Sequence, residues 1–226
     1  GTTAKFPGVV HPSGTYNYKA SDNKPIPYFA ISPESFGKLK RLTERGLTPK
    51  IKFHLDTELY LKPENNVNII GEITGSDPKL KDEVVMIGAH FDSWHPASGS
   101  TDNGAGSAVM MEVMRIIKAT GLKPKRTIRM ALWGSEELGL VGSRAYGERH
   151  FGKVNETIRK KEVEKISAYI NMDNGAGKMR GIYLQGNEAV KPIFEEMLKS
   201  YAYLDVNSLT IENTNFTDHE VFDFYK

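Results

Sequence analysis

The sequence predicts an α/β fold, a three-layer sandwich with a mostly parallel central sheet. Two observations carry this prediction. Continuous apolar runs alternate along the chain with segments of helical apolar spacing, and such runs are typical of strands that are buried on both faces. The 226 residues, of which 39% are hydrophobic, are enough for one globular domain of this kind.

The first part of the chain predicts one helix and two strands. The helix begins at Pro33, with Ser32 as its N-cap, and ends at Gly46, because these residue types favour those positions. Alternating polar and apolar residues predict a half-buried strand over 51–62. A second strand is predicted over 65–75.

From residue 83 onward, predicted strands and helices alternate. Buried strands are predicted over 83–92, 127–137 and 166–174, and a further short strand over 181–186. Helices are predicted over 104–121, 142–151 and 189–204. This alternation is the basis for a largely parallel sheet.

Composition excludes several functional classes. Lys plus Arg number 30 and Asp plus Glu number 28, so the net charge of +2 gives no reason to expect nucleic acid or an anionic membrane as partner. The chain has no cysteine, which excludes disulfides, thiolate zinc sites and a cysteine nucleophile. No apolar run approaches the roughly 18 residues of a membrane span. The sequence also lacks a Gly-x-Ser-x-Gly nucleophile motif.

Polar side chains follow three of the predicted strands, at the point where each strand ends. His90 and Asp92 end the first strand, Glu136 and Glu137 the second, and Asp173 the third. Ligands of open α/β sheets bind outside the carboxyl ends of the strands, so these groups converge if the strands are neighbours. Imidazole and carboxylate ligands without thiolates suit zinc, cobalt or manganese.

Asp102 adds a further carboxylate, in the loop where the next helix begins. A carboxylate there can bridge two metals about 3.5–4 Å apart. Asp92 lies two residues after His90 on an extended strand, so it can accept the second N–H of the imidazole. Of two adjacent carboxylates, one can bind metal while the other acts as a general base. Each pattern alone also occurs in solvated turns, and their succession at three strand ends favours a metal site.

Four blocks of the sequence resemble a known family in order and spacing: GAHFDSW, STDNGAGSAVMMEVMRII, RTIRMALWGSEELGLVGSRAY and INMDNGAG. They are similar to the signature blocks of peptidase family M28, the di-zinc metallopeptidases. Within it, DSW and LKPKRTIRMALWGSEE are most similar to the plasma glutamate carboxypeptidase (carboxypeptidase Q) branch. The resemblance implies a zinc exopeptidase-like fold, two zinc ions and a short peptide as substrate.

The resemblance also implies a set of metal ligands. His90 and Asp173 would bind one zinc ion, Glu137 would bind the other, and Asp102 would bridge the two. The peptide bond after Asp102 is often cis in this family. The remaining family ligand is a late histidine in a pattern like H-x-x-x-D-T, which does not occur here. One zinc ion would therefore keep only Asp102 and Glu137 from the protein.

Other residues are assigned roles in catalysis and substrate binding. The resemblance implies that Glu136 is the general base that takes a proton from the bridging water, and we place Asp92 beside it among the catalytic residues. Trp94 ends the first signature block and His95 follows it, and both are candidates for substrate contact. His219 lies in a T-D-H block that, in the family, is near the site but does not bind metal, and we place it with the substrate contacts.

Two segments are predicted for the chain. Residues 1–50 resemble the tail of a protease-associated-like lid with a connecting helix, and residues 51–226 resemble an M28 catalytic domain without its C-terminal end. The chain is therefore expected to be a piece of an M28 enzyme that is cut at both ends.

Alternative functions stay open at this point. Glutaminyl cyclases keep the sandwich and a related acidic site but transfer an acyl group with a single zinc ion. An inactive fragment or a non-catalytic binding module is the other alternative, because the fifth ligand is absent. The resemblance leaves a homodimer open and implies a secreted or periplasmic location. The sequence does not separate amino-terminal from carboxy-terminal specificity and does not give a side-chain preference.

Overall fold

The chain divides into two compact units, Gly1–Glu64 and Asn65–Lys226. A computed structural model describes residues 11–13, 28–54, 66–94, 97–154, 159–173 and 177–225. Within these ranges, no helix combines the length and the apolar character needed to cross a membrane.

The described residues of the first unit form a short antiparallel pair of strands and one helix. Its elements are β1 (His11–Ser13), β2 (Tyr28–Ala30) and α1 (Pro33–Glu44). The start of α1 is as predicted, because the Ser32 hydroxyl accepts a hydrogen bond from the backbone N–H of Ser35 at 3.2 Å. Residues 51–54 of the predicted strand over 51–62 are not in a strand, and residues 55–62 lie outside the described part of the chain.

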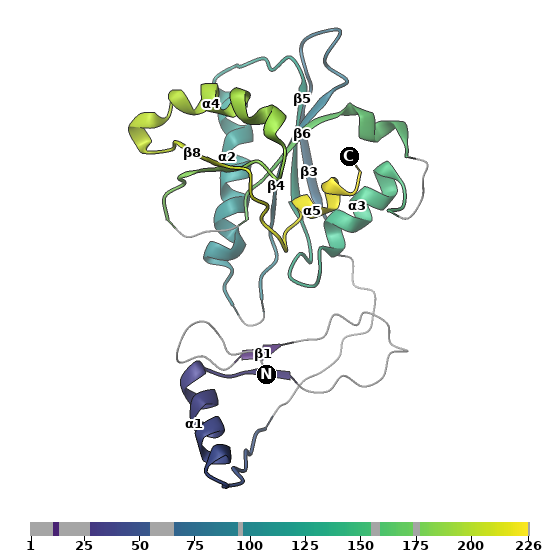
Figure 1. Ribbon diagram of the computed structural model, residues 1–226. Helices are drawn as coiled ribbons and strands as arrows, with labels where there is room; N and C mark the ends of the chain where they lie inside the picture. The colour runs from purple at the N-terminus through teal and green to yellow at the C-terminus, as the bar shows by residue number, and fades with distance from the viewer. Residues whose placement is uncertain are drawn as a thin grey trace. The chain divides into compact units, whose positions relative to one another are not determined.

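A four-stranded mixed sheet forms the centre of the second unit (Figure 1). In spatial order its strands are β3 (Ile69–Ile73), β5 (Thr127–Trp133), β4 (Val84–His90) and β6 (Ile166–Asn171). β4 is parallel to both β5 and β6, and β3 is antiparallel to β5. The predicted α/β fold with a mostly parallel sheet is therefore confirmed.

Helices cover both faces of this sheet. They are α2 (Gly106–Ala119), α3 (Val141–Phe151) and α5 (His219–Asp223). Figure 1 shows α2 on one side of the sheet and α3 and α5 on the other. The strand period of two sends alternate side chains to opposite faces, so Ile87 and Leu132 pack with Met110 of α2. Met86 and Trp133 pack in a second core with residues of α3 and α5.

β6 differs from its prediction as a buried strand. It forms the edge of the described sheet and hydrogen-bonds only to β4 among the described strands, and each of its residues is either half-buried or exposed. The apolar run that predicted a buried strand therefore has only one neighbouring strand in the described sheet.

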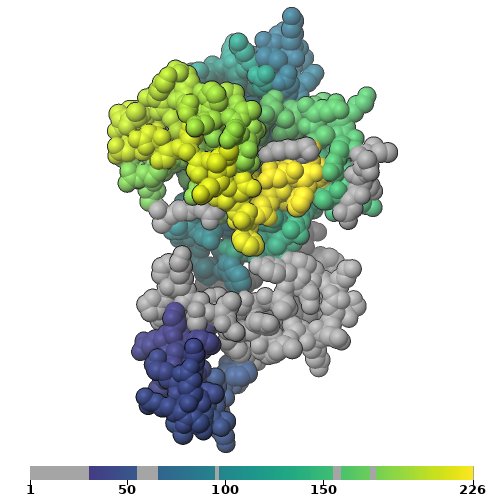
Figure 2. Space-filling model, in the orientation of Figure 1, coloured from purple at the N-terminus to yellow at the C-terminus, as the bar shows by residue number. Residues whose placement is uncertain are grey.

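Smaller elements complete the second unit. They are η1 (Ser100–Ala105), η2 (Lys161–Lys165), β7 (Gly181–Tyr183), η3 (Glu188–Val190), α4 (Lys191–Lys199), η4 (Ala202–Leu204) and β8 (Ser208–Thr210). β7 and β8 pair in parallel as a separate two-stranded sheet. The helix predicted over 189–204 is divided into η3, α4 and η4. In the space-filling view, the segments from α4 to α5 adjoin one another on the visible face (Figure 2).

A buried polar contact crosses the face of the sheet that carries α3 and α5. Trp133 on β5 donates its indole N–H to the Tyr169 hydroxyl on β6 at 2.7 Å. β4 lies between these two strands, and the contact is possible because Gly88 has no side chain. A Cβ at Gly88 would overlap the Tyr169 hydroxyl and lie 3.0 Å from Nε1 of Trp133.

Substitution Gly88→Ala is expected to lower the free energy of unfolding by about 1–3 kcal/mol, because the added methyl displaces packed side chains. Gly71→Ala on β3 is a matched control, since its Cβ would meet only Met130 Cε at an ordinary 3.6 Å. Its effect should stay within about 0.5 kcal/mol. Urea denaturation measures both, and equal effects of the two variants would contradict this packing.

Candidate metal centre

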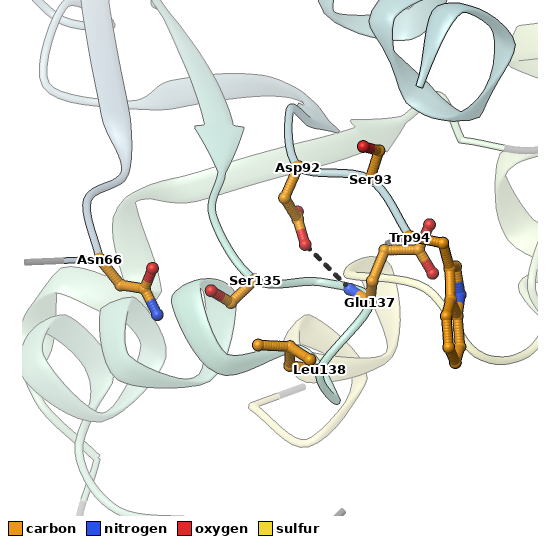
Figure 3. Close-up of a pocket in the computed structure, with 7 residues that line it drawn as sticks. All are labelled: Asn66, Asp92, Ser93, Trp94, Ser135, Glu137 and Leu138. Atoms are coloured by element: carbon orange, nitrogen blue, oxygen red, sulfur yellow. Dashed lines mark hydrogen bonds between the residues drawn. The ribbon is translucent and has the colours of Figure 1, made fainter. Parts of the chain in front are cut away.

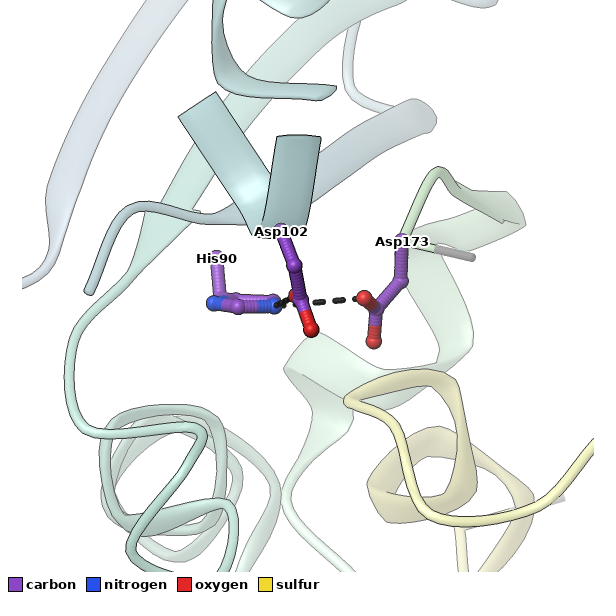
Figure 4. Close-up of side chains that lie close together, drawn as sticks. All are labelled: His90, Asp102 and Asp173. Carbon is purple, nitrogen blue, oxygen red and sulfur yellow. Dashed lines mark hydrogen bonds and ion pairs between the residues drawn. The ribbon is translucent and has the colours of Figure 1, made fainter. Parts of the chain in front are cut away.

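The carboxyl ends of β4, β5 and β6 place an imidazole among carboxylates. Among the residues that the structure describes, two groups of side chains have ligand atoms within 4.8 Å of one another. The first group is His90, Asp102 and Asp173, and the second is His90, Glu136 and Glu137. Figure 4 shows the carboxylates of Asp102 and Asp173 directed at the imidazole of His90 from two different loops. The structure thus brings together all five side chains that were predicted to bind metal or to act as the general base.

His90 is the shared member of both groups. It is the last residue of β4 and only 1% exposed. Its Nε2 lies 3.0 Å from Asp102 Oδ1 and 3.2 Å from Asp173 Oδ1. Its Nδ1 donates to the main-chain carbonyl of Asp92 at 3.1 Å. The nitrogen that faces the carboxylates is therefore fixed by the backbone on the opposite side of the ring.

Asp92 lies beside the His90 imidazole and also makes contacts that were not predicted. Its carboxylate lies 3.5 Å from His90 Nδ1, whereas its two oxygens accept the backbone N–H groups of Glu136 and Glu137 at 3.0 and 3.2 Å. β5 ends at Trp133, and the chain then turns through Ser135, which has a φ of 57°. Asp92 therefore holds the turn that carries the two glutamates.

Asp102 is positioned by the irregular segment η1, and 65% of its side chain is exposed. The peptide bond between Asp102 and Asn103 is cis, as the family resemblance implied. Asn103 is buried, and its side-chain amide donates to the Met172 carbonyl at 2.9 Å and accepts from the Gly106 N–H at 3.1 Å. The asparagine side chain thus ties the start of α2 to the residue before Asp173.

Sequence reasoning missed Asn103. Its only sequence signal is the dipeptide Asn103-Gly104, which also reads as an ordinary turn. The carbonyl that its side chain reaches is 69 residues away in the chain, and nothing in the local pattern indicates it.

The protonation of the site reflects burial and crowding of like charges. Burial lowers the pKa of His90, but its contacts with Asp173 and Asp92 outweigh burial and raise that pKa to about 11. Burial raises the pKa of Glu136 to about 8 and that of Glu137 to about 7, and neighbouring carboxylates add to both shifts. Without a cation, the site therefore keeps protons that carboxylates normally lose.

The donor set fits divalent cations. Oε1 of Glu137 is buried and accepts no hydrogen bond from the described residues, and a buried acceptor of this kind requires a partner. A nearby imidazole and several carboxylates supply the remaining donors, which suit zinc.

The structure describes two of the three predicted substrate contacts, Trp94 and His219. Trp94 lines a pocket of about 250 Å³ beside Glu137, together with Leu138, Ser135 and Asn66 (Figure 3). His95 lies outside the described residues.

His219 belongs to neither candidate ligand group. It is 9% exposed, and its Nε2 donates to the Thr214 carbonyl at 3.0 Å. One ring nitrogen of His219 is therefore hydrogen-bonded to the loop before α5.

Comparison with known proteins identifies related chains. The model of peptidase family M28 matches residues 68–225. Carboxypeptidase Q of Rattus norvegicus is 32% identical over 185 residues, which cover 81% of this chain and 36% of that protein. A peptidase M28 precursor from Shewanella amazonensis superposes with a TM-score of 0.66 at 28% identity, over 92% of this chain and 44% of the other. A zinc aminopeptidase from Bacillus subtilis superposes with a TM-score of 0.53 at 27% identity, over 69% and 36%.

These matches confirm the resemblance on which the site assignment was based. They also show that the chain spans 36% of the length of the rat relative and 44% of the Shewanella structure.

The metal-free protein should lose stability as the pH rises. The folded-state pKa of Glu136 lies above the ordinary 4.5, at about 8, and that of His90 lies above 6.5, at about 11. The folded chain therefore binds more protons than the unfolded chain between pH 4.5 and about 8 because of Glu136, and between pH 6.5 and about 11 because of His90. Raising the pH through these two windows favours unfolding. Thermal melts of the chelator-treated protein across these windows measure the effect.

Two histidine variants serve as controls for this pH dependence. His90→Asn should remove the alkaline part of the decline. His150→Asn, at a histidine of α3 outside both ligand groups, should leave it intact. A melting temperature that rises or stays constant over the window would contradict the assigned protonation.

Proposed function

Because this chain belongs to peptidase family M28, we propose that it is part of a zinc-dependent exopeptidase that hydrolyses short peptides. The observation that carries the proposal is the buried imidazole of His90 between the carboxylates of Asp102 and Asp173. The related Bacillus subtilis enzyme is a zinc aminopeptidase and the rat relative is a carboxypeptidase, and both names support exopeptidase chemistry.

We propose that the site binds two zinc ions. His90 and Asp173 would hold one ion, Glu137 would hold the other, and Asp102 would contribute to both. His90, Asp102 and Asp173 have ligand atoms within 4.8 Å of one another, and so do His90, Glu136 and Glu137. The buried Oε1 of Glu137, which accepts no hydrogen bond from the described residues, supports the assignment of Glu137. When bound, zinc supplies a Lewis acid for the scissile carbonyl and makes water acidic enough to lose a proton near neutral pH.

Glu136 is the general base in this proposal. Its side chain is 8% exposed, and its Oε2 lies 4.0 Å from His90 Nε2. A catalytic base works best when its pKa lies near the working pH. Burial raises the pKa of Glu136 in the metal-free chain, and bound cations would lower it again. Its carboxylate takes a proton from the attacking water and later delivers it to the leaving amine. Asp92 contributes by holding the backbone of Glu136 in place.

The substrate side chain has a candidate location beside this centre. The pocket lined by Trp94, Leu138 and Glu137 is open to a peptide that approaches the metal ligands. Contacts from His95 and His219, a homodimer, and a secreted or periplasmic location remain predictions. So does the assignment of residues 1–50 to a lid segment and of residues 51–226 to the catalytic domain.

Substitution Glu136→Gln tests the general base. It keeps the shape of the side chain but removes proton transfer, so kcat should fall by about 10²–10⁴ while the zinc content stays the same. Dipeptide hydrolysis and elemental analysis measure the two quantities. Glu164→Gln, at an exposed residue of η2, is the matched control and should change neither.

Full activity of the Glu136→Gln variant would contradict the role of Glu136. Cyclisation of an N-terminal glutamine without dipeptide hydrolysis would instead favour the acyl-transfer alternative.

A further inference from the structure

Asp218 is a fully buried carboxyl group that the proposed reaction does not use. It directly precedes α5 and is 0% exposed. Neither of its carboxylate oxygens accepts a hydrogen bond of normal geometry from any residue in the described ranges, although the Ser143 hydroxyl lies near enough to act on its pKa. Its side chain does not cap α5, so the usual local reason for an aspartate at this position is missing.

A chain of hydrogen bonds leads from β5 and β6 to the backbone of Asp218. The Tyr169 hydroxyl, which accepts from Trp133, donates to Asn171 Oδ1 at 2.7 Å. The Asn171 amide donates to Thr217 Oγ1 at 2.8 Å, and the backbone N–H of Asp218 donates to the same oxygen at 2.7 Å. Residues of β5 and β6 therefore fix the position of a carboxylate that has no partner of its own.

The charged neighbours of Asp218 are groups of the metal centre. Its carboxylate interacts electrostatically with His90, Asp173 and Asp92, and it acts on Glu136 in the same way. Burial raises the pKa of Asp218 to about 7, although the Ser143 hydroxyl and His90 oppose that shift. Asp218 is nevertheless absent from both groups of side chains close enough to share an ion.

Burying an unpaired carboxylate costs folding free energy, and the cost is offset by nearby positive charge, by hydrogen bonds or by protonation of the group. His90 is a single cation shared among several carboxylates, so a further positive charge is needed to keep Asp218 ionised. Two divalent ions at the candidate centre would supply it.

We propose that Asp218 is a positioning residue for the metal centre, a buried counter-charge that strengthens zinc binding without coordinating zinc. This inference rests on the proposed function, because it requires that the chain binds zinc. The Asp218 carboxylate should lower the stability of the metal-free protein and raise its affinity for zinc. Removing the carboxylate should therefore stabilise the metal-free protein and weaken zinc binding.

The test is Asp218→Asn, a substitution of nearly equal shape without charge. In the chelator-treated protein at mildly alkaline pH, the melting temperature should rise, because an unpaired buried charge is removed. The dissociation constant for zinc should increase roughly 10–100-fold, as for other residues that support a metal site from outside its ligands. Calorimetry measures the first quantity, and competition between zinc and a chromophoric chelator measures the second.

Asp205→Asn provides the matched control. It removes the same charge from an exposed side chain that pairs with Lys178, and it should change neither quantity beyond experimental scatter. Asp218→Ser separates charge from volume, because the smaller neutral side chain should show the same loss of zinc affinity.

The outcomes distinguish this inference from the proposed function. If the unmodified chain binds no zinc, both fail. If it binds zinc and Asp218→Asn binds equally well, only the counter-charge role is overturned. A lower melting temperature of the metal-free Asp218→Asn protein, or its failure to fold, would likewise overturn that role, because it would make Asp218 a structural residue.

Discussion

A single buried imidazole faces more negative charge than it can neutralise. His90 is enclosed on its Nε2 side by Asp102, Asp173 and Glu136. A carboxylate oxygen of Glu137 also lies within 4.8 Å of a ring nitrogen of His90. Removing several anions from water is unfavourable unless positive charge balances them. The raised pKa values of Glu136 and Glu137 express this imbalance in the metal-free chain. A pair of divalent cations would remove it, and the proposed peptidase chemistry depends on that charge balance.

The sheet topology produces this crowding. β4 lies between β5 and β6 and is parallel to both, so three carboxyl ends meet at one edge. The side chain of His90 follows the same strand period as Met86, which packs in the core beside α3 and α5. Main-chain contacts then fix the surrounding loops. Asp92 holds the turn of the two glutamates, and Asn103 joins the start of α2 to the end of β6.

Much of the fold and the outline of the site could be predicted from the sequence. Continuous apolar runs located β4 and β5, and ligand-type residues directly after strands identified the five clustered side chains. The edge position of β6 could not be predicted, because an apolar run does not state which strands will pair with it. The roles of Asn103 and Asp92 depend on contacts with backbone atoms far along the chain, and the burial of Asp218 depends on how α5 packs. A local pattern contains neither kind of information.

Zinc is proposed to bind among His90, Asp102, Asp173 and Glu137. Anomalous diffraction from zinc-soaked crystals, recorded on both sides of the zinc absorption edge, would locate the ions. Two peaks are expected, the first about 2 Å from His90 Nε2 and from an oxygen of Asp173, and the second about 2 Å from an oxygen of Glu137. Asp102 should lie within the same distance of both peaks. Zinc peaks confined to exposed surface residues, or none at this edge of the sheet, would contradict this proposal.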